Sequence, residues 1–184
     1  MRSSLARELA AEFFGTFILI VFGCAVVAQV VIGDGNYGDT LSINFGWGVA
    51  VTMGVFAAGG ITGAHINPAV TLALAVHRQF PWSKVLPYSL AQTAGAFVAS
   101  VVVFVAYYDA LGTFDSGRTM ATAGIWATYP QDYLTTRGGL VDQVVGTALL
   151  VALVFAVFLQ RNLAPPAHMP PLLVGARVVS IGRT

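Results

Sequence analysis

The beginning of the chain contains an apolar run too long for most soluble domains. From Leu9 to Ile32 it reads LAAEFFGTFILIVFGCAVVAQVVI, 24 residues in which Glu12 is the only charged side chain. A helix needs about 20 predominantly apolar residues to cross the hydrocarbon core of a bilayer. The run also exceeds the apolar region of about 7 to 15 residues in a secretory signal. It therefore predicts a membrane helix that the protein retains.

Similar runs recur along the rest of the chain, so we expect an all-α membrane protein. Composition agrees, with 57% hydrophobic residues, 9% charged residues and a mean hydropathy of +0.77. A net charge of +1 leaves no basic surface for nucleic acid, and a single cysteine excludes an internal disulfide. Predicted spans lie at 9–32, 41–59, 84–107 and 139–160, followed by a short apolar piece at 171–181. The segment 107–139 lacks clear periodicity and is predicted to be a surface loop.

The distribution of basic residues predicts which side of the membrane holds the N-terminus. If the N-terminus is cytoplasmic, five Lys or Arg residues fall inside and two outside. The excess of inside charge follows the positive-inside rule. The inside residues are Arg2, Arg7, Arg78, Lys84 and Arg161, and the outside residues are Arg118 and Arg137.

The stretch GGITGAHINPAV, residues 59–70, interrupts the apolar pattern after the second predicted span. Pro68 suits the first position of a helix and Asn67 can cap it, so a new helix is predicted to begin there. The stretch is too short to cross the membrane again and predicts a re-entrant segment. Its glycines suit extended backbone, in which residues 63–66 would offer carbonyl acceptors to a polar solute in single file. The alternative is an ordinary kink or loop between two helices.

Two polar residues inside spans are predicted to hold this re-entrant segment. AEFFGT from Ala11 resembles DQVVGT from Asp142, which aligns Glu12 with Gln143 and indicates an inverted internal repeat. Acids buried in spans are costly, and we expect Glu12 and Gln143 to accept the segment's amides. His65 is interpreted as structural, because no second His or Cys completes a metal site. The sequence contains no cofactor motif and no set of nucleophile, base and orienting group, so we do not expect an enzyme.

Several motifs together resemble the major intrinsic protein family, in particular its aquaglyceroporin branch. They are AEFFGT, GITGAHINPAVTLALA, YSLAQTAGAFVAS, VAYYDAL, WATYP and DQVVGTALL, spread over about residues 8–182. The resemblance implies an aquaporin-like right-handed helical bundle with six spans and two half-helices whose Asn-Pro-Ala caps meet at mid-membrane. It also implies a homotetramer with one pore per subunit.

The same resemblance assigns roles to individual residues. Asn67, Pro68 and Ala69 form the first central motif, and Gly63, Ala64, His65 and Ile66 form the ladder before it. Glu12 and Gln143 are its structural anchors. Trp47 matches the aromatic wall of the selectivity filter, and Gly182 matches a position that is small in glycerol-conducting members. Both point to a constriction wide enough for glycerol.

The chain departs from the family pattern in its second half. It has one Asn-Pro-Ala motif, and counting from Gln143 places the expected second asparagine beyond Thr184. The filter arginine, the second half-helix and the sixth span are likewise missing from the sequence. Arg177 lies within the expected fifth span. We therefore expect a single incomplete domain over 1–184, with a first repeat at about 8–107, a loop at 108–138 and a partial, inverted second repeat at about 139–184.

Two functional hypotheses remain at this stage. The first is a passive channel in the cell membrane for glycerol, other small neutral solutes and water. The second is a non-conducting, truncated paralogue or fragment, which could associate with a full-length homologue. An enzyme is a distant third.

Overall fold

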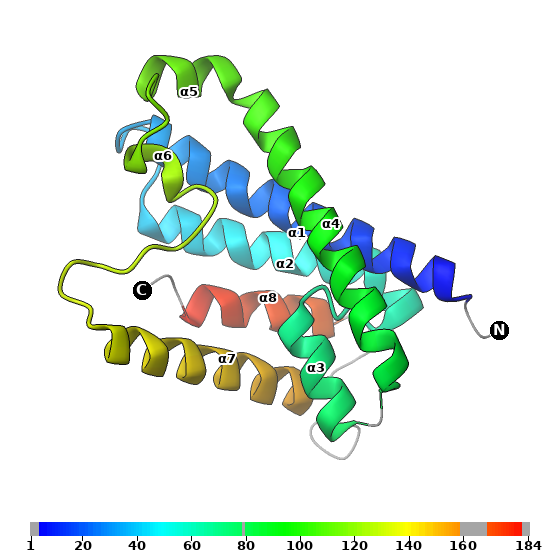
Figure 1. The fold of residues 1–184 in the computed structure, drawn as a ribbon. Coiled ribbons are helices and arrows are strands. Elements are labelled where there is room, and N and C mark those ends of the chain that lie inside the picture. The colour runs from blue at the N-terminus through cyan, green and yellow to red at the C-terminus, as the bar shows by residue number, and fades with distance from the viewer. Residues whose placement is uncertain (1–3, 79, 159–168, 182–184) are drawn as a thin grey trace.

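The computed structural model describes residues 4–78, 80–158 and 169–181, in which the regular structure is helical (Figure 1). Membrane-length helices α1, α2, α4 and α7 account for most of it. Within the described residues the helices are α1 (Leu5–Ile32), α2 (Thr40–Thr62), α3 (Pro68–His77), α4 (Trp82–Ala106), α5 (Tyr108–Phe114), α6 (Met120–Ala123), α7 (Thr136–Phe158) and α8 (Pro170–Ile181). The all-α membrane fold predicted from the sequence is confirmed.

Local signals explain where the first two spans begin. The Ser4 hydroxyl accepts a hydrogen bond from the Arg7 amide at the start of α1. Asp39 and Ser42 form a reciprocal capping box at the start of α2. Both caps satisfy amides that a helix end would otherwise leave unpaired. The four long helices overlap the predicted spans with ends shifted by up to four residues.

Two expectations about the connecting segments are wrong. Gly59 and Gly60 are helical, because α2 continues to Thr62 instead of ending at 59. At membrane depth a helix keeps its backbone groups paired, which outweighs the low helix propensity of glycine. The segment 107–139 is not a plain loop either, since it contains the short helices α5 and α6. Helices this short carry no long periodic pattern, so they could not be recognised from hydrophobic periodicity.

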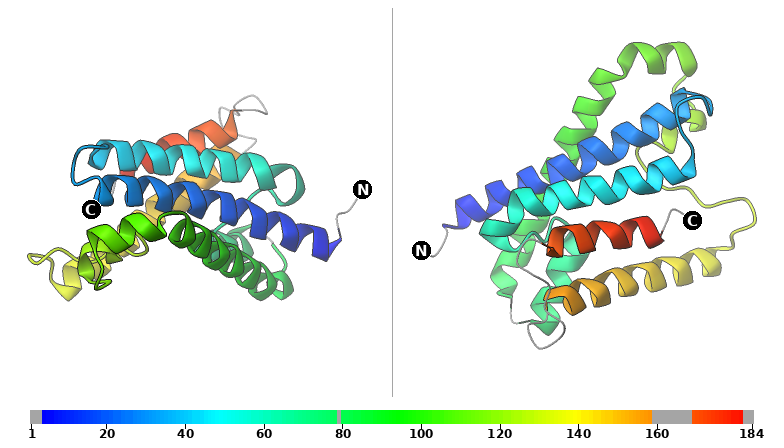
Figure 2. Two further views of the ribbon diagram at one scale, coloured as in Figure 1. Left: turned by 90° about the horizontal axis from the view of Figure 1, so that it is seen from above. Right: turned by 180° about the vertical axis from the view of Figure 1, so that it is seen from behind.

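The four membrane-length helices run in alternating directions. In Figure 1 α1 starts beside the N-terminus and α7 runs the opposite way, the relation expected of inverted copies. Helix α1 packs against both α2 and α4, while α8 packs against α2 and α7. Figure 2 shows α8 lying between α2 and α7 from behind. The short α3 contacts α4 and α7, so the re-entrant segment lies among elements from both halves of the chain.

Large apolar side chains cover the outer faces of the long helices. Exposed examples include Phe45 and Phe56 on α2, Phe97 on α4 and Leu149 on α7. A soluble protein rarely exposes so much contiguous apolar surface. These faces suit contact with lipid chains, and the protein is a multi-pass membrane protein.

The crossing of α1 and α4 depends on Gly95. A Cβ atom added there would lie 2.3 Å from the Phe13 carbonyl oxygen, a backbone atom that no rotamer change can move. We expect Gly95→Ala to lower the free energy of unfolding by about 1–3 kcal/mol, because the two helices must separate. Thermal unfolding in detergent, followed by circular dichroism, measures the loss. Gly146→Ala on α7 is the matched control, since nothing lies within 4 Å of its added Cβ. Equal melting temperatures for the two variants would contradict the expectation.

Candidate functional site

The re-entrant segment begins with a tight reversal at the end of α2. Gly63 has φ 83°, and its amide donates to the Gly59 carbonyl at 3.0 Å. Glycine adopts this left-handed conformation without strain, which ends the helix. Ala64 and Ile66 also have positive φ angles, of 57° and 40°. The backbone over 63–66, called the turn below, therefore has positive φ angles at three of its four residues and is neither helix nor strand, whereas the sequence suggested extended backbone.

Asn67 and Pro68 start the half-helix α3. The Asn67 Oδ1 atom accepts a hydrogen bond from the Ala69 amide at 2.8 Å, and Pro68 occupies the first turn. This arrangement caps the helix with the side-chain oxygen. The side-chain NH₂ group of Asn67 takes no part in this cap and remains available as a hydrogen-bond donor.

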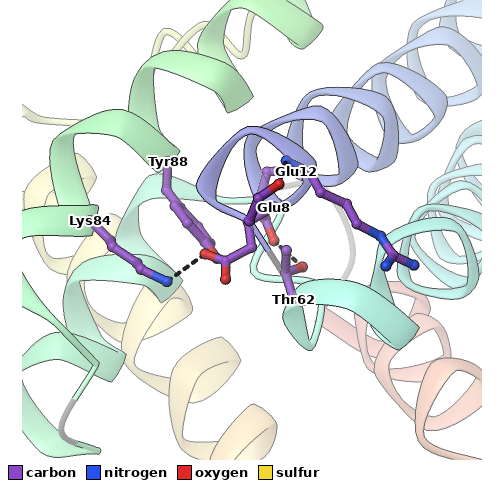
Figure 3. Close-up of polar contacts among 7 residues, drawn as sticks. Glu8, Glu12, Thr62, Lys84 and Tyr88 are labelled. Atoms are coloured by element: carbon purple, nitrogen blue, oxygen red, sulfur yellow. Dashed lines mark hydrogen bonds and ion pairs between the residues drawn. The ribbon is translucent and has the colours of Figure 1, made fainter. Parts of the chain in front are cut away.

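Glu12 lies at the centre of the hydrogen bonds that hold the segment. Its carboxylate is fully buried and accepts from the His65 amide at 3.1 Å and the Ile66 amide at 2.7 Å. It also accepts from the Thr62 hydroxyl and from Gln92 Nε2, the latter at 2.8 Å. Figure 3 shows Glu12 on α1 directed toward Thr62. Four donors around one carboxylate explain how the positive-φ turns are held in place.

His65 is fixed by the same network. Its Nδ1 atom lies 3.1 Å from the Thr71 hydroxyl, which also accepts from Gln92 Nε2 at 3.0 Å and donates to the Asn67 carbonyl at 3.0 Å. With that hydroxyl proton committed, Nδ1 is assigned as the donor and Nε2 as the remaining acceptor. The ring packs on Phe80 and Tyr88 at centroid distances of 4.7 and 5.2 Å.

A second anchor, one helical turn before Glu12, joins α1 to α4. The Glu8 carboxylate accepts from Lys84 Nζ at 2.6 Å and from the Tyr88 hydroxyl at 2.9 Å (Figure 3). The sequence did not identify three further site residues, which are Lys84, Tyr88 and Gln92. Their spacing of four residues puts them on one face of a helix, and that periodicity was the available signal.

Trp47 on α2 packs against α1 at a position without a side chain. A Cβ atom at Gly23 would lie 2.3 Å from the Trp47 ring, so the indole occupies space that only glycine leaves open. Gly182, predicted as the small residue of a constriction wide enough for glycerol, lies outside the described residues.

The predicted role of Gln143 is not borne out by the geometry. Its side chain is exposed on α7 and donates to Asp142 at 3.5 Å, away from residues 63–66. An anchor of the kind formed by Glu12 needs backbone amides within hydrogen-bond distance.

Three cavities share lining residues and therefore lie in series. The outer cavity, of 380 Å³, is bounded by Cys24, Asn44, Trp47, Ser100, Trp126 and Val178, among others. The middle cavity, of 210 Å³, shares Trp47 and Val178 with it and includes Asn67 and Ile66. The inner cavity, of 290 Å³, shares Ala64, His65, Val70 and Val154 with the middle one and includes Gly63. Pro68 and Ala69 are not among the lining residues of these cavities.

The segment after α5 closes one side of the outer cavity. Asp115 accepts from the Thr119 amide and the Thr122 hydroxyl, both at 2.8 Å. The backbone N–H of Thr119, and next the Thr122 hydroxyl, hold the pKa of the Asp115 carboxyl below its usual range. Because α6 is tied back in this way, Ile125 and Trp126 reach the cavity wall.

These features define a class of membrane protein: a helical bundle with a half-helix that starts among buried polar groups and lines a row of cavities. The family model of the major intrinsic proteins matches residues 1–182, and the chain belongs to that family.

Individual relatives place the chain beside aquaglyceroporins. It is 50% identical to Aquaporin-10 of Milnesium tardigradum over 98% of its own length and 46% of that protein. It is 45% identical to human Aquaporin-9, again over 98% of the chain and 63% of the relative. The X-ray structure of the aquaglyceroporin from Plasmodium falciparum superposes with a TM-score of 0.88 and 27% identity, covering 98% of this chain and 73% of that one. The chain thus spans about half to two thirds of the length of these curated relatives.

Proposed function

We propose that the protein is a passive channel subunit for glycerol, other small neutral solutes and water. The observation that carries this proposal is the series of three cavities, which runs past Trp47, Asn67 and His65. A route of this kind lets a solute move between polar contacts without a conformational cycle. The names of the relatives and of the aligned structure support the same conclusion.

The chemistry of the cavity walls favours a polyol. Asn67 supplies an amide donor and the Asn44 and Ser100 side chains supply further polar groups. Trp47 and Val178 supply an apolar wall on the shared stretch. A polyol presents hydroxyl groups on one side and carbon–hydrogen bonds on the other, so both walls are used. The proposed pore residues are thus Asn67, Trp47 and the turn 63–66, with Glu12 holding that turn.

The finer assignments of assembly and location follow the family. The proposed state is a homotetramer in the cell membrane with a cytoplasmic N-terminus. Exposed apolar faces on α2 and α4 would serve for contacts between subunits. The basic residues near the start of the chain and around 78–84 support the orientation.

Glycerol flux into proteoliposomes tests this proposal. Vesicles containing the 184-residue chain are expected to re-swell in a glycerol gradient faster than protein-free vesicles. Val178→Trp should reduce the protein-dependent rate about tenfold or more, because the side chain lies where the outer and middle cavities join. Each tenfold change in rate corresponds to about 1.4 kcal/mol in the barrier.

Val145→Trp is the matched control, since Val145 is 51% exposed on the outer face of α7. Swelling at the rate of empty vesicles would reject conduction by this chain and favour the non-conducting alternative. Equal inhibition of glycerol flux by Val178→Trp and Val145→Trp would reject the proposed route through the three cavities.

A further inference from the structure

We propose that Arg78 and Phe155 form a second, solute-contacting selectivity point, at the end of the route opposite Trp47. The inference rests on the proposed function and adds a site to it. The two residues come from different elements, since Arg78 follows α3 directly and Phe155 lies on α7. Both line the inner cavity.

The geometry places a cation directly over an aromatic face. The guanidinium carbon of Arg78 lies 5.1 Å from the centroid of the Phe155 ring, within the range of a cation–π contact. His77 approaches the same ring edge-on at a centroid distance of 6.0 Å. Arg78 stands at the C-terminus of α3, where the helix dipole favours positive charge. The contact therefore links the C-terminal end of α3 to α7 beside the inner cavity.

The walls of this cavity are divided into a polar and an apolar side. Arg78, Thr62 and His65 bring hydrogen-bonding groups, whereas Phe155, Leu74 and Val154 bring apolar surface. A guanidinium offers several donors in a fixed plane and accepts none, so it suits the oxygen atoms of a polyol. The ring supplies a flat surface for the carbon atoms of the same solute. The pair of Arg78 and Phe155 thus resembles the wall proposed around Trp47, because in both places a hydrogen-bond donor lies beside an aromatic ring.

The position of Arg78 also bears on ions. A guanidinium carries a positive charge, and Arg78 lines the inner cavity beside Phe155 of α7. A positive charge on the wall of a solute route raises the barrier for cations while leaving neutral solutes unaffected. The pair is thus suited to pass small polyols and to reject cations.

Cysteine labelling tests the pair without relying on conduction. In a chain carrying Cys24→Ala and Val154→Cys, the new thiol lies on the wall shared by the middle and inner cavities. N-ethylmaleimide is added to open membrane fragments, with and without molar glycerol. Glycerol is expected to slow labelling in this chain more than in one carrying Cys24→Ala and Val145→Cys, which corrects for viscosity. Arg78→Gln and Phe155→Leu should each raise the labelling rate about three- to tenfold and remove most of the glycerol protection.

Arg118→Gln is the matched control. The Arg118 guanidinium stacks on Phe104 and Tyr108, both at 5.6 Å, but does not line the inner cavity. It should leave rate and protection unchanged. Phe155→Leu keeps an apolar side chain of similar volume, and circular dichroism verifies that each variant is folded.

The outcomes separate this inference from the proposed function. The proposed role of Arg78 and Phe155 would be overturned if Arg78→Gln and Phe155→Leu had the same labelling rate and the same glycerol protection as the parent chain. Protection that depends on Arg78, in a chain whose vesicles show no glycerol flux, would uphold the pair and reject only conduction. Where flux is present, Arg78→Gln should raise sodium leak relative to glycerol flux, and an unchanged ratio would overturn the rejection of cations.

Discussion

Glu12→Ala is expected to unfold the re-entrant segment. It should also destabilise the protein more than the replacement of any other single side chain by alanine. The substitution removes the acceptor of four donors, on Thr62, His65, Ile66 and Gln92. Each buried donor left unpaired costs about 1–3 kcal/mol, so a total of about 4 kcal/mol or more is expected. Positive φ angles at Ala64 and Ile66 add to the effect, because only the surrounding contacts hold them.

The measurement is thermal unfolding in detergent, combined with limited proteolysis of the segment. Glu12→Gln serves as the control, since its amide oxygen can still accept while its NH₂ group cannot. It should lose less stability than Glu12→Ala. A melting temperature for Glu12→Ala within a few degrees of the parent would show that the segment holds its shape without the carboxylate.

Arg177→Leu is expected to have the opposite effect and to stabilise the protein. Arg177 is 9% exposed in α8, and its Nη1 and Nη2 atoms have no hydrogen-bond partner among the described residues. A cation inside a membrane helix costs about 2.5–3.5 kcal/mol on insertion scales. Replacing it with an apolar side chain of smaller volume should recover about 2–3 kcal/mol, less a cavity contribution.

The same thermal assay decides the sign of this effect. Arg118→Leu is the control, because Arg118 donates to the Asp115 carbonyl at 3.2 Å and packs over two rings outside the long spans. That variant should be neutral or slightly destabilised. A lower melting temperature for Arg177→Leu would mean that the guanidinium is paired with an acceptor in the folded protein.

The spans could be read from the sequence because the bilayer imposes a simple rule. An apolar run of about 20 residues has few alternatives to a transmembrane helix, so the positions of α1, α2, α4 and α7 followed directly. Asn67 and Pro68 likewise specified the start of α3, since capping is a local interaction. The short helices α5 and α6 were missed, because their formation depends on contacts such as those of Asp115.

The interior of the site followed less directly. Burial of an acid predicted that Glu12 would hold the turn, but the identity of its other partners depended on how α4 packs against α1. Gln143 carried the same sequence signal and has no such turn beside it in the described residues. Sequence periodicity predicts which face of a helix a residue occupies. It does not predict a hydrogen bond, which needs a partner atom within about 3 Å.

The sequence by itself determined that the protein lies in a membrane, the number of its long spans, the helix start at Asn67 and the resemblance to the family. These depend on hydrophobicity, length and local capping, which act between residues close in the chain. Only the tertiary structure decided the left-handed turns at 63–66, the ring of donors on Glu12, the alignment of the three cavities and the meeting of Arg78 with Phe155. The hydrogen bonds of Glu12 and the contact of Arg78 with Phe155 join residues 50 or more positions apart, as between Glu12 and Thr62, and only the packing of the helices brings such residues together.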